Sequence, residues 1–252
     1  MHTDFDHMAE GFQKREQGHL HAYLREQIAH RFPRMQEIQI LDLGCGTGQL
    51  VDFFSSSGMA VIGIDISRPL LDRNRASRHL LVLGDGSALP FTDNAFSVVV
   101  INHVLRHASN PARILAEAYR VLRVPGLLLV TEFVTADLRR RPVWKLFPRL
   151  EEITSKRLVN FPAIANASKT VGFADIEVTE SVPVGIRNQT VDQYIAYVRN
   201  RPIRDLYCFD DLEFTSCCNA FESDLRSHYD SVVEYELTYS FMRATKAETR
   251  AI

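Results

Sequence analysis

Three closely spaced glycines are the residues of this chain with the clearest chemical meaning. Gly44, Gly46 and Gly48 follow a short apolar run and precede a segment with helical spacing, which predicts a strand, a glycine turn and a helix. Glycine lets backbone approach a ligand where a Cβ atom would collide. The helix N-terminus behind the turn offers backbone N–H groups to polar ligand atoms. We therefore predict a ligand-binding loop, with Asp42 just before it helping to fix the turn.

The glycine spacing separates this loop from the dinucleotide-binding fingerprint. That fingerprint reads G-x-G-x-x-G. Here the third glycine arrives one residue early, as G-x-G-x-G, and Gln49 stands where the NAD-type glycine would be. The spacing therefore disfavours an NAD-binding protein.

An acidic residue, Asp65, ends the next apolar segment, which reads as a buried strand. In a doubly wound sheet, an acid at the end of the second strand can accept hydrogen bonds from both hydroxyls of a ribose. The alternative is that Asp65 caps the helix that begins near Pro69. Ser67 can begin that helix without it, so the ribose contact is favoured.

A third apolar segment leads into G-D-G-S-A-L-P-F at residues 84–91. Asp85 and Gly86 form a dipeptide that is typical of turns. A turn role does not exclude a ligand contact by the same residues. A fourth buried strand follows at 96–101 and runs into Asn102 and His103.

In this order, the four segments resemble the motifs of the class I S-adenosylmethionine (SAM) dependent methyltransferases, in particular the ubiquinone/menaquinone-biosynthesis type that acts on small molecules. The resemblance covers residues 36–135 well and the rest weakly. It implies that the glycines approach the methionine part of SAM, that Asp65 binds the ribose and that Asp85 accepts from the adenine amino group. The cofactor-binding residues so implied are Asp42, Gly44, Cys45, Gly46, Gly48, Asp65, Ile66, Asp85, Gly86, Ser87, Asn102 and His103.

Methyl transfer from SAM requires few catalytic side chains, because the sulfonium is already a good leaving group. The protein must hold nucleophile, methyl carbon and sulfur in line, and a base is needed only when the nucleophile is protonated. His107 sits where the related enzymes often carry a histidine, and it is the predicted catalytic residue. The alternative is that His107 only orders its loop. Glu132 is a second pocket candidate, with a solvated strand-end acid as its alternative.

Composition narrows the function classes. The 252 residues carry a formal net charge of -2, which gives no sign of a nucleic-acid surface. No apolar run long enough for a membrane span exists, and the N-terminal residues lack a signal-peptide pattern. The histidines and cysteines do not have metal-ligand spacing, so no metal is expected. Four cysteines without a disulfide framework fit a reducing cytoplasm.

The predicted fold is α/β: a doubly wound, mostly parallel seven-stranded sheet of the Rossmann-like methyltransferase type, with an antiparallel last strand and an inserted helical cap. We expect a single class I methyltransferase domain over residues 1–252. Within it, residues 1–35 form an N-terminal helical cover and 36–135 the SAM-binding core. Residues 137–170 and 182–230 are expected to form the substrate cap.

The two ends of the chain have patterns of their own. Residues 7–32 read as a helix, and Phe5 or Phe12 is a candidate for an aromatic contact with the cofactor, as in related enzymes. Residues 232–242 alternate with period two, with Tyr235 and Tyr239 on the apolar side, which predicts the last strand.

The cap segments are rich in aromatic and basic residues, which suits an aromatic or carboxylate-bearing substrate. The alternative is that Tyr194 and Tyr197, at helical spacing, only form a packed helix face. The sequence leaves the oligomeric state and the acceptor atom open. It is also compatible with two other functions: an enzyme of the same fold with a different reaction, such as a cyclisation, and a non-catalytic SAM-binding protein. The aromatic and basic cap residues are Trp144, Phe147, Arg187, Tyr194, Tyr197, Arg199, Arg201, Arg204 and Tyr207.

Overall fold

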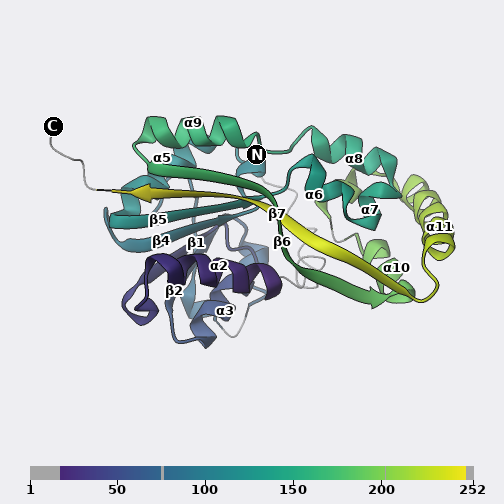
Figure 1. The fold of residues 1–252 in the computed structure, drawn as a ribbon, viewed down its shortest axis with the longest axis horizontal. Helices are drawn as coiled ribbons and strands as arrows, with labels where there is room; N and C mark the ends of the chain where they lie inside the picture. Colours follow the sequence, from purple (N-terminus) through teal and green to yellow (C-terminus); the bar gives the residue numbers. More distant parts are fainter. Residues whose placement is uncertain (1–17, 75–76, 202, 248–252) are drawn as a thin grey trace.

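A computed structural model describes residues 18–74, 77–201 and 203–247, and they form a seven-stranded sheet in the order β3-β2-β1-β4-β5-β7-β6 (Figure 1). The first five strands run parallel, and β7 pairs antiparallel with both β5 and β6. The predicted sheet is therefore confirmed. The strands are β1 (Gln39–Leu43), β2 (Ala60–Asp65), β3 (Leu81–Leu83), β4 (Phe96–Asn102), β5 (Leu122–Glu132), β6 (Ala174–Thr190) and β7 (Val232–Lys246).

The central strands are apolar on both faces because helices cover both faces. Ile40, Val98 and Val100 face a core that includes side chains of α2 (Gly18–Arg31) and α3 (Gln49–Ser56). Leu41 and Val99, which alternate with them, face the core under α5 (Pro111–Val121) and α9 (Phe161–Val171). Figure 1 shows the two helical layers on opposite sides of the sheet. Short helical turns fill the connections: η2 (Met35–Glu37), α4 (Arg68–Leu71), η3 (Arg78–Leu80) and η4 (Leu105–His107).

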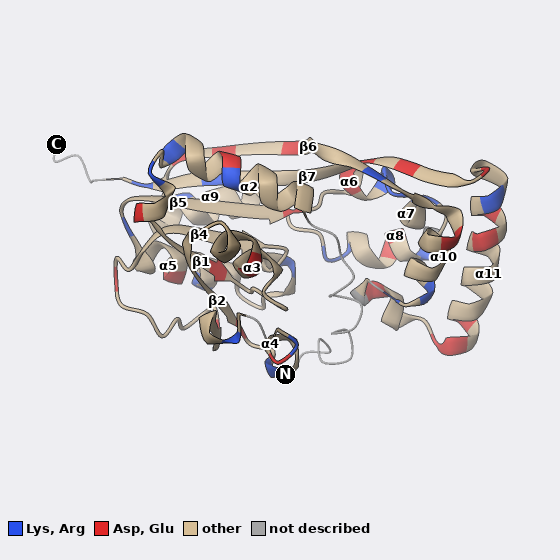
Figure 2. Ribbon diagram, turned by 90° about the horizontal axis from the view of Figure 1, so that it is seen from below, with Lys and Arg blue, Asp and Glu red and all other residues tan. Residues whose placement is uncertain are grey.

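The long β6–β7 hairpin extends beyond the sheet. Only Ser240–Lys246 of β7 pair with β5, whereas Val232–Tyr239 pair with β6 alone. The extended part meets a group of helices at the far end of the molecule (Figures 1 and 2). We call this group together with the extended hairpin the cap. Its helices are α6 (Thr135–Arg139), α7 (Pro142–Lys145), α8 (Pro148–Ser155), α10 (Val191–Arg199), η5 (Arg204–Cys208) and α11 (Asp211–His228).

Capping residues set where the cap helices begin. Thr190 accepts from the N–H of Gln193, whose side chain accepts from the Thr190 N–H in return, and this box starts α10. Asp210 accepts from the Glu213 N–H and starts α11. The apolar faces of these two helices pack on each other through residues such as Tyr194 and Phe221.

The structure differs from the expected segment limits in three places. Residues 182–190 are strand and not helical cap, because they continue β6 along its partner β7. The last strand reaches Lys246. Helix α9, expected in the cap, packs instead against α5 over the sheet. Of the helix expected over residues 7–32, the described part is α2, Gly18–Arg31, and Phe5 and Phe12 lie outside the described residues.

Candidate functional site

The glycine loop follows β1 and holds all three glycines at positive φ: 79° for Gly44, 55° for Gly46 and 75° for Gly48. A Cβ atom on Gly44 would collide with Val104, and one on Gly48 would lie 2.8 Å from the Asn74 amide nitrogen. A Cβ atom on Gly46 would meet no described atom within 4 Å. Two of the glycines are therefore required by packing, and Gly46 is the one that faces open space.

Asp65 fastens this loop to the end of β2. Its Oδ2 accepts from the Gly46 N–H at 2.7 Å, and its Oδ1 accepts from the Ser67 N–H at 2.8 Å. Ser67 in turn accepts from the Leu70 N–H and caps α4, so the helix-cap alternative for Asp65 is not the one observed. The N–H groups of Gly44, Cys45 and Gly48 also donate to protein carbonyls, so these loop donors are used inside the protein.

Two acids lie beneath the loop. Asp42 is 2% exposed, and burial together with nearby Asp65 raises the pKa of its carboxyl to about 8. Burial also raises the pKa of Asp65, against the hydrogen bonds from Ser67 and Gly46. Burial raises the pKa of the Cys45 thiol too, and its side chain packs over Gly63. This arrangement favours a ligand that brings hydrogen-bond donors or positive charge to the loop.

An apolar shelf flanks the loop at the ends of β2 and β3. Ile66 is 58% exposed and Leu83 is 43% exposed, and the strand ends that carry them are paired neighbours. Asp85 follows and accepts from the Ser87 N–H at 2.8 Å, which is the turn that the Asp-Gly sequence predicts. Gly86 packs so closely on Leu43 that a Cβ would lie 2.8 Å from its side chain. The shelf and Asp85 can bind a flat ring with a polar edge.

The ends of β4 and β5 carry a buried acid beside an imidazole. Glu132 is completely buried, so the solvated alternative for this acid is wrong. Burial raises the pKa of Glu132 to about 7, although the charge of Arg106 lowers it. The backbone N–H of Arg106 donates to Glu132 Oε1 at 3.3 Å. His103 Nδ1 lies 3.5 Å from Glu132 Oε2, and the His103 ring stacks on Phe133 with 4.3 Å between centroids.

The two candidate histidines occupy different places. The His103 backbone N–H donates to the Thr131 carbonyl, and its ring lines a cavity. Asn102, half-buried, ends β4 just before it. His107 lies one turn further, where its Nε2 accepts from Arg106 Nε at 3.1 Å, and it does not line this cavity. His107 as a base therefore stays a prediction, and His103 is the histidine that the structure presents to the cavity.

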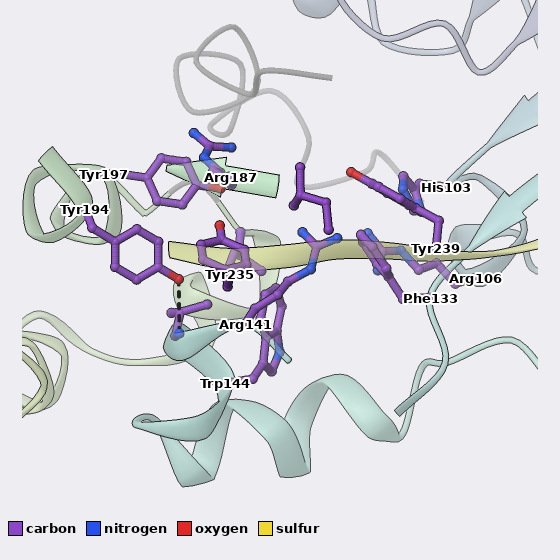
Figure 3. Close-up of a pocket in the computed structure, with 13 residues that line it drawn as sticks. His103, Arg106, Phe133, Arg141, Trp144, Arg187, Tyr194, Tyr197, Tyr235 and Tyr239 are labelled. Carbon is purple, nitrogen blue, oxygen red and sulfur yellow. Dashed lines mark hydrogen bonds between the residues drawn. The ribbon is translucent and has the colours of Figure 1, made fainter. Parts of the chain in front are cut away.

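The cavity, of about 50 Å³, lies between this edge of the sheet and the cap. Four tyrosines, three arginines and Trp144 contribute to its wall, and none of the described lining residues is acidic. Figure 3 shows His103 at one end, Arg141 in the middle and Arg187 with Tyr197 at the other end. The tyrosines are Tyr194, Tyr197, Tyr235 and Tyr239.

Only part of the aromatic and basic set expected in the cap reaches this cavity. Tyr194 belongs to the cavity wall and is also packed: it is 1% exposed, and its hydroxyl accepts from the Val143 N–H at 3.1 Å. Phe147 packs against Phe209 and Phe221 instead of lining the cavity. Sequence reasoning missed Arg106, Phe133, Arg141, Tyr235 and Tyr239. Two sequence patterns could have indicated some of these residues: the run of three arginines at 139–141, and the tyrosines that alternate with period two in the last strand.

Residues 41–130 match a protein family described as "Methyltransferase domain". A demethylmenaquinone methyltransferase of Renibacterium salmoninarum is 32% identical over 64% of this chain and 65% of its own length. One from Corynebacterium kroppenstedtii is 40% identical over 38% of this chain and 42% of its own length. The chain thus spans less than two thirds of these curated relatives.

A solved chain from Anabaena variabilis, described as a methyltransferase from an antibiotic biosynthesis pathway, superposes with a TM-score of 0.73 at 17% identity, covering 89% of this chain and 97% of that one. The resemblance stated from the sequence is supported over residues 41–130, which match the methyltransferase family, and the predicted fold is confirmed by the superposition on the solved chain.

Two absences hold for the described part of the chain. No helix there is long and apolar enough to cross a membrane. Within the same residues, no group of three His, Cys, Asp or Glu side chains is arranged to hold a metal ion.

Proposed function

We propose that this protein transfers a methyl group from S-adenosylmethionine to a small-molecule acceptor bound in the cavity between the sheet and the cap. The observation that carries the proposal is a juxtaposition at one edge of the sheet. The glycine loop after β1, Asp65 at the end of β2 and His103 after β4 lie at neighbouring strand ends, and His103 also lines the cavity. Ligands of open α/β sheets bind at this edge.

The donor fits the chemistry of the loop. The sulfonium and ammonium groups of SAM bring the positive charge that buried Asp42 and Asp65 favour. Its ribose hydroxyls are donors for the Asp65 carboxylate. The adenine ring fits the shelf of Ile66 and Leu83, with its amino group toward Asp85. Gly46 leaves the space through which the ligand approaches the backbone.

In the reaction, a nucleophilic atom of the acceptor attacks the methyl carbon as the carbon–sulfur bond breaks. The bonding electron pair stays on sulfur, which leaves S-adenosylhomocysteine. When the nucleophile carries a proton, His103 takes it, and Glu132 holds the imidazole and balances its charge. His107 is the second candidate for this proton and acts there only if its contact with Arg106 opens.

The setting proposed for this reaction is the cytoplasm, where the free cysteines Cys45, Cys208, Cys217 and Cys218 stay reduced. The net charge of -2 favours a small molecule over a nucleic acid as acceptor.

Calorimetric titration with SAM, S-adenosylhomocysteine and NAD tests the donor. We expect SAM and S-adenosylhomocysteine to bind with dissociation constants on the order of micromolar, and NAD not to bind. Asp65→Asn keeps the side-chain size but removes the carboxylate, so it should weaken SAM binding roughly tenfold or more. The exposed Asp72, whose ion pairs lie away from the loop, gives the matched control Asp72→Asn. Absence of SAM binding in the wild type would sink the proposal.

Product analysis tests the reaction type. Methyl transfer produces S-adenosylhomocysteine in step with methylated acceptor, whereas a cyclase or a binding protein of this fold leaves SAM intact. His103→Asn and His107→Asn form a matched pair, because both remove an imidazole from the same loop. Asn also tolerates the positive φ of 58° at position 103. We expect the larger loss of turnover from His103→Asn.

A further inference from the structure

The cap side of the cavity carries positive charge that the described residues do not balance. Arg106 has an acidic side chain within ion-pair distance, because its Nε lies 3.8 Å from Glu132 Oε2. For Arg141 and Arg187, the described residues offer no carboxylate within ion-pair distance, and none of the described cavity-lining residues is acidic. Burying unpaired positive charge costs free energy unless a ligand supplies the counter-charge.

Arg141 is the best-defined of these groups. Its guanidinium carbon lies 4.3 Å from the centroid of the Phe133 ring and 5.2 Å from that of Tyr239, so the two rings hold the group by cation–π contact. Its Nη2 donates to the Thr238 carbonyl at 3.4 Å. Its Nε is shielded from solvent and has no hydrogen-bond partner among the described residues. A shielded N–H without an acceptor points to a ligand that provides one.

Arg187 reaches the cavity from β6, where its guanidinium carbon lies 5.3 Å from the centroid of the Tyr197 ring. Figure 3 shows the order along the cavity: His103, then Phe133 and Tyr239, then Arg141, then Arg187. Arg141 and Arg187 therefore lie away from the His103 end of the cavity, where we place the methyl donor. The rings of Phe133 and Tyr239 lie between that end and the two arginines.

We propose that the acceptor is an aromatic carboxylate. Arg141 binds the carboxylate and Arg187 adds a second cationic contact, while the aromatic body lies along Phe133 and Tyr239 with its nucleophile toward His103. This inference deepens the proposed function and rests on it. A guanidinium fork matches a carboxylate with two parallel hydrogen bonds. The flat ring faces that line the cavity favour a planar carboxylate, which lies in the plane of its own ring, over a tetrahedral phosphate.

The protein contains its own probe for this test. Trp144 is the one tryptophan of the chain and lines the cavity, so its fluorescence reports occupancy. We would saturate the protein with S-adenosylhomocysteine and titrate benzoate, benzamide and phenyl phosphate. Benzoate and benzamide have nearly the same shape and differ in charge. We expect benzoate to bind at roughly millimolar concentration and at least tenfold more tightly than benzamide, with phenyl phosphate weaker than benzoate.

Arg141→Gln should abolish the preference for benzoate over benzamide, and Arg187→Gln should reduce it less. Arg140→Gln is the matched control, because Arg140 is the neighbouring arginine but pairs with exposed Glu236 outside the cavity. It should keep the full preference. Calorimetric binding of S-adenosylhomocysteine by each variant shows that the donor half is intact.

Each contrary result has a distinct meaning. Equal binding of benzoate and benzamide by the wild type, no binding of benzoate, or benzoate binding unchanged in Arg141→Gln overturns the carboxylate assignment. Tighter binding of phenyl phosphate overturns it in favour of a phosphate. If the wild type fails to bind S-adenosylhomocysteine, the proposed function itself has failed, and that is measured separately.

Discussion

The two halves of this molecule form their binding surfaces in different ways. In the sheet half, the glycine loop that we propose binds SAM is fixed by its backbone, through positive φ at its glycines and N–H groups that donate to Asp65 and to the Ile64 carbonyl. In the cap half, the cavity wall consists of side chains such as Arg141 and Tyr239, on an extended hairpin and short helices. A backbone-built site tolerates little change, whereas a side-chain-built site can be altered one residue at a time.

The halves also differ in charge. The sheet half buries carboxyls with raised pKa values beneath the loop, and the cap half presents arginines to the cavity. The pattern suits a cationic donor on one side and an anionic acceptor on the other. Variants of each half should therefore affect one ligand and spare the other.

The largest difference between the effect on SAM binding and the effect on benzoate binding is expected from Gly46→Ala. The new Cβ meets no described atom, so the cost in unfolding free energy should be only the roughly 1–2 kcal/mol of a non-glycine residue at positive φ. The same methyl group occupies the space that we assign to SAM. We expect SAM affinity to fall roughly a hundredfold, about 2.7 kcal/mol, while benzoate still changes Trp144 fluorescence.

Gly44→Ala gives the contrast within the same loop. Its Cβ collides with Val104, so this variant should lose about 2–4 kcal/mol of unfolding free energy in urea. Val104→Ala in the Gly44→Ala background should recover part of that loss. Undiminished SAM binding by a folded Gly46→Ala protein would show that the open face of the loop is not the donor site.

A second, intermediate effect is expected where the halves meet, at Glu132. Burial raises the pKa of this acid from 4.5 to about 7, so the folded protein holds the proton more tightly than the unfolded chain. Its contribution to unfolding free energy is therefore present at low pH and falls as pH rises toward 7. Turnover should move the opposite way, because the carboxylate supports the protonated His103.

Glu132→Gln should remove the activity rise near pH 7 and lower turnover roughly a hundredfold. It should also make the fall in unfolding free energy between pH 4.5 and pH 7 less steep, while the part that Asp42 contributes remains and continues up to its folded pKa of about 8. Activity profiles and urea titrations at several pH values measure both. A positioning role is refuted if Glu132→Gln keeps the wild-type pH profile of activity.

The difference between the halves also explains what the sequence could predict. The sheet and the turn of the glycine loop could be predicted because buried apolar strands and glycines at fixed spacing are local signals in the sequence, whereas the assignment of these residues to SAM stays a prediction. The place of Arg141, Tyr235 and Tyr239 in the cavity wall could not be predicted, because it depends on how far the β6–β7 hairpin extends beyond β5. Tyr235 and Tyr239 read only as the apolar side of a strand. Their meaning appears when the hairpin places them opposite α7 and the end of β5.

The smallest predicted effect concerns a hydrogen bond between two cap helices. It tests whether the cap can be destabilised without a change in SAM binding by the sheet half. Helix α7 begins at Pro142, and the Val143 N–H, one of its otherwise unpaired first-turn donors, is satisfied by the Tyr194 hydroxyl of α10. Tyr194→Phe removes that acceptor and should cost about 1–2 kcal/mol of unfolding free energy in urea. Tyr229→Phe, at a half-buried position near the end of α11, is the control.

Helix α7 and the residue just before it position Trp144 and Arg141, so Tyr194→Phe should also weaken benzoate binding by a few-fold. SAM affinity should stay at the wild-type value, because no loop residue contacts this hydrogen bond. A loss of SAM binding equal to the loss of benzoate binding would mean that the two halves are coupled through the hairpin. In that case the donor site and the acceptor site would be built differently, one from backbone and one from side chains, but their binding free energies would not be independent.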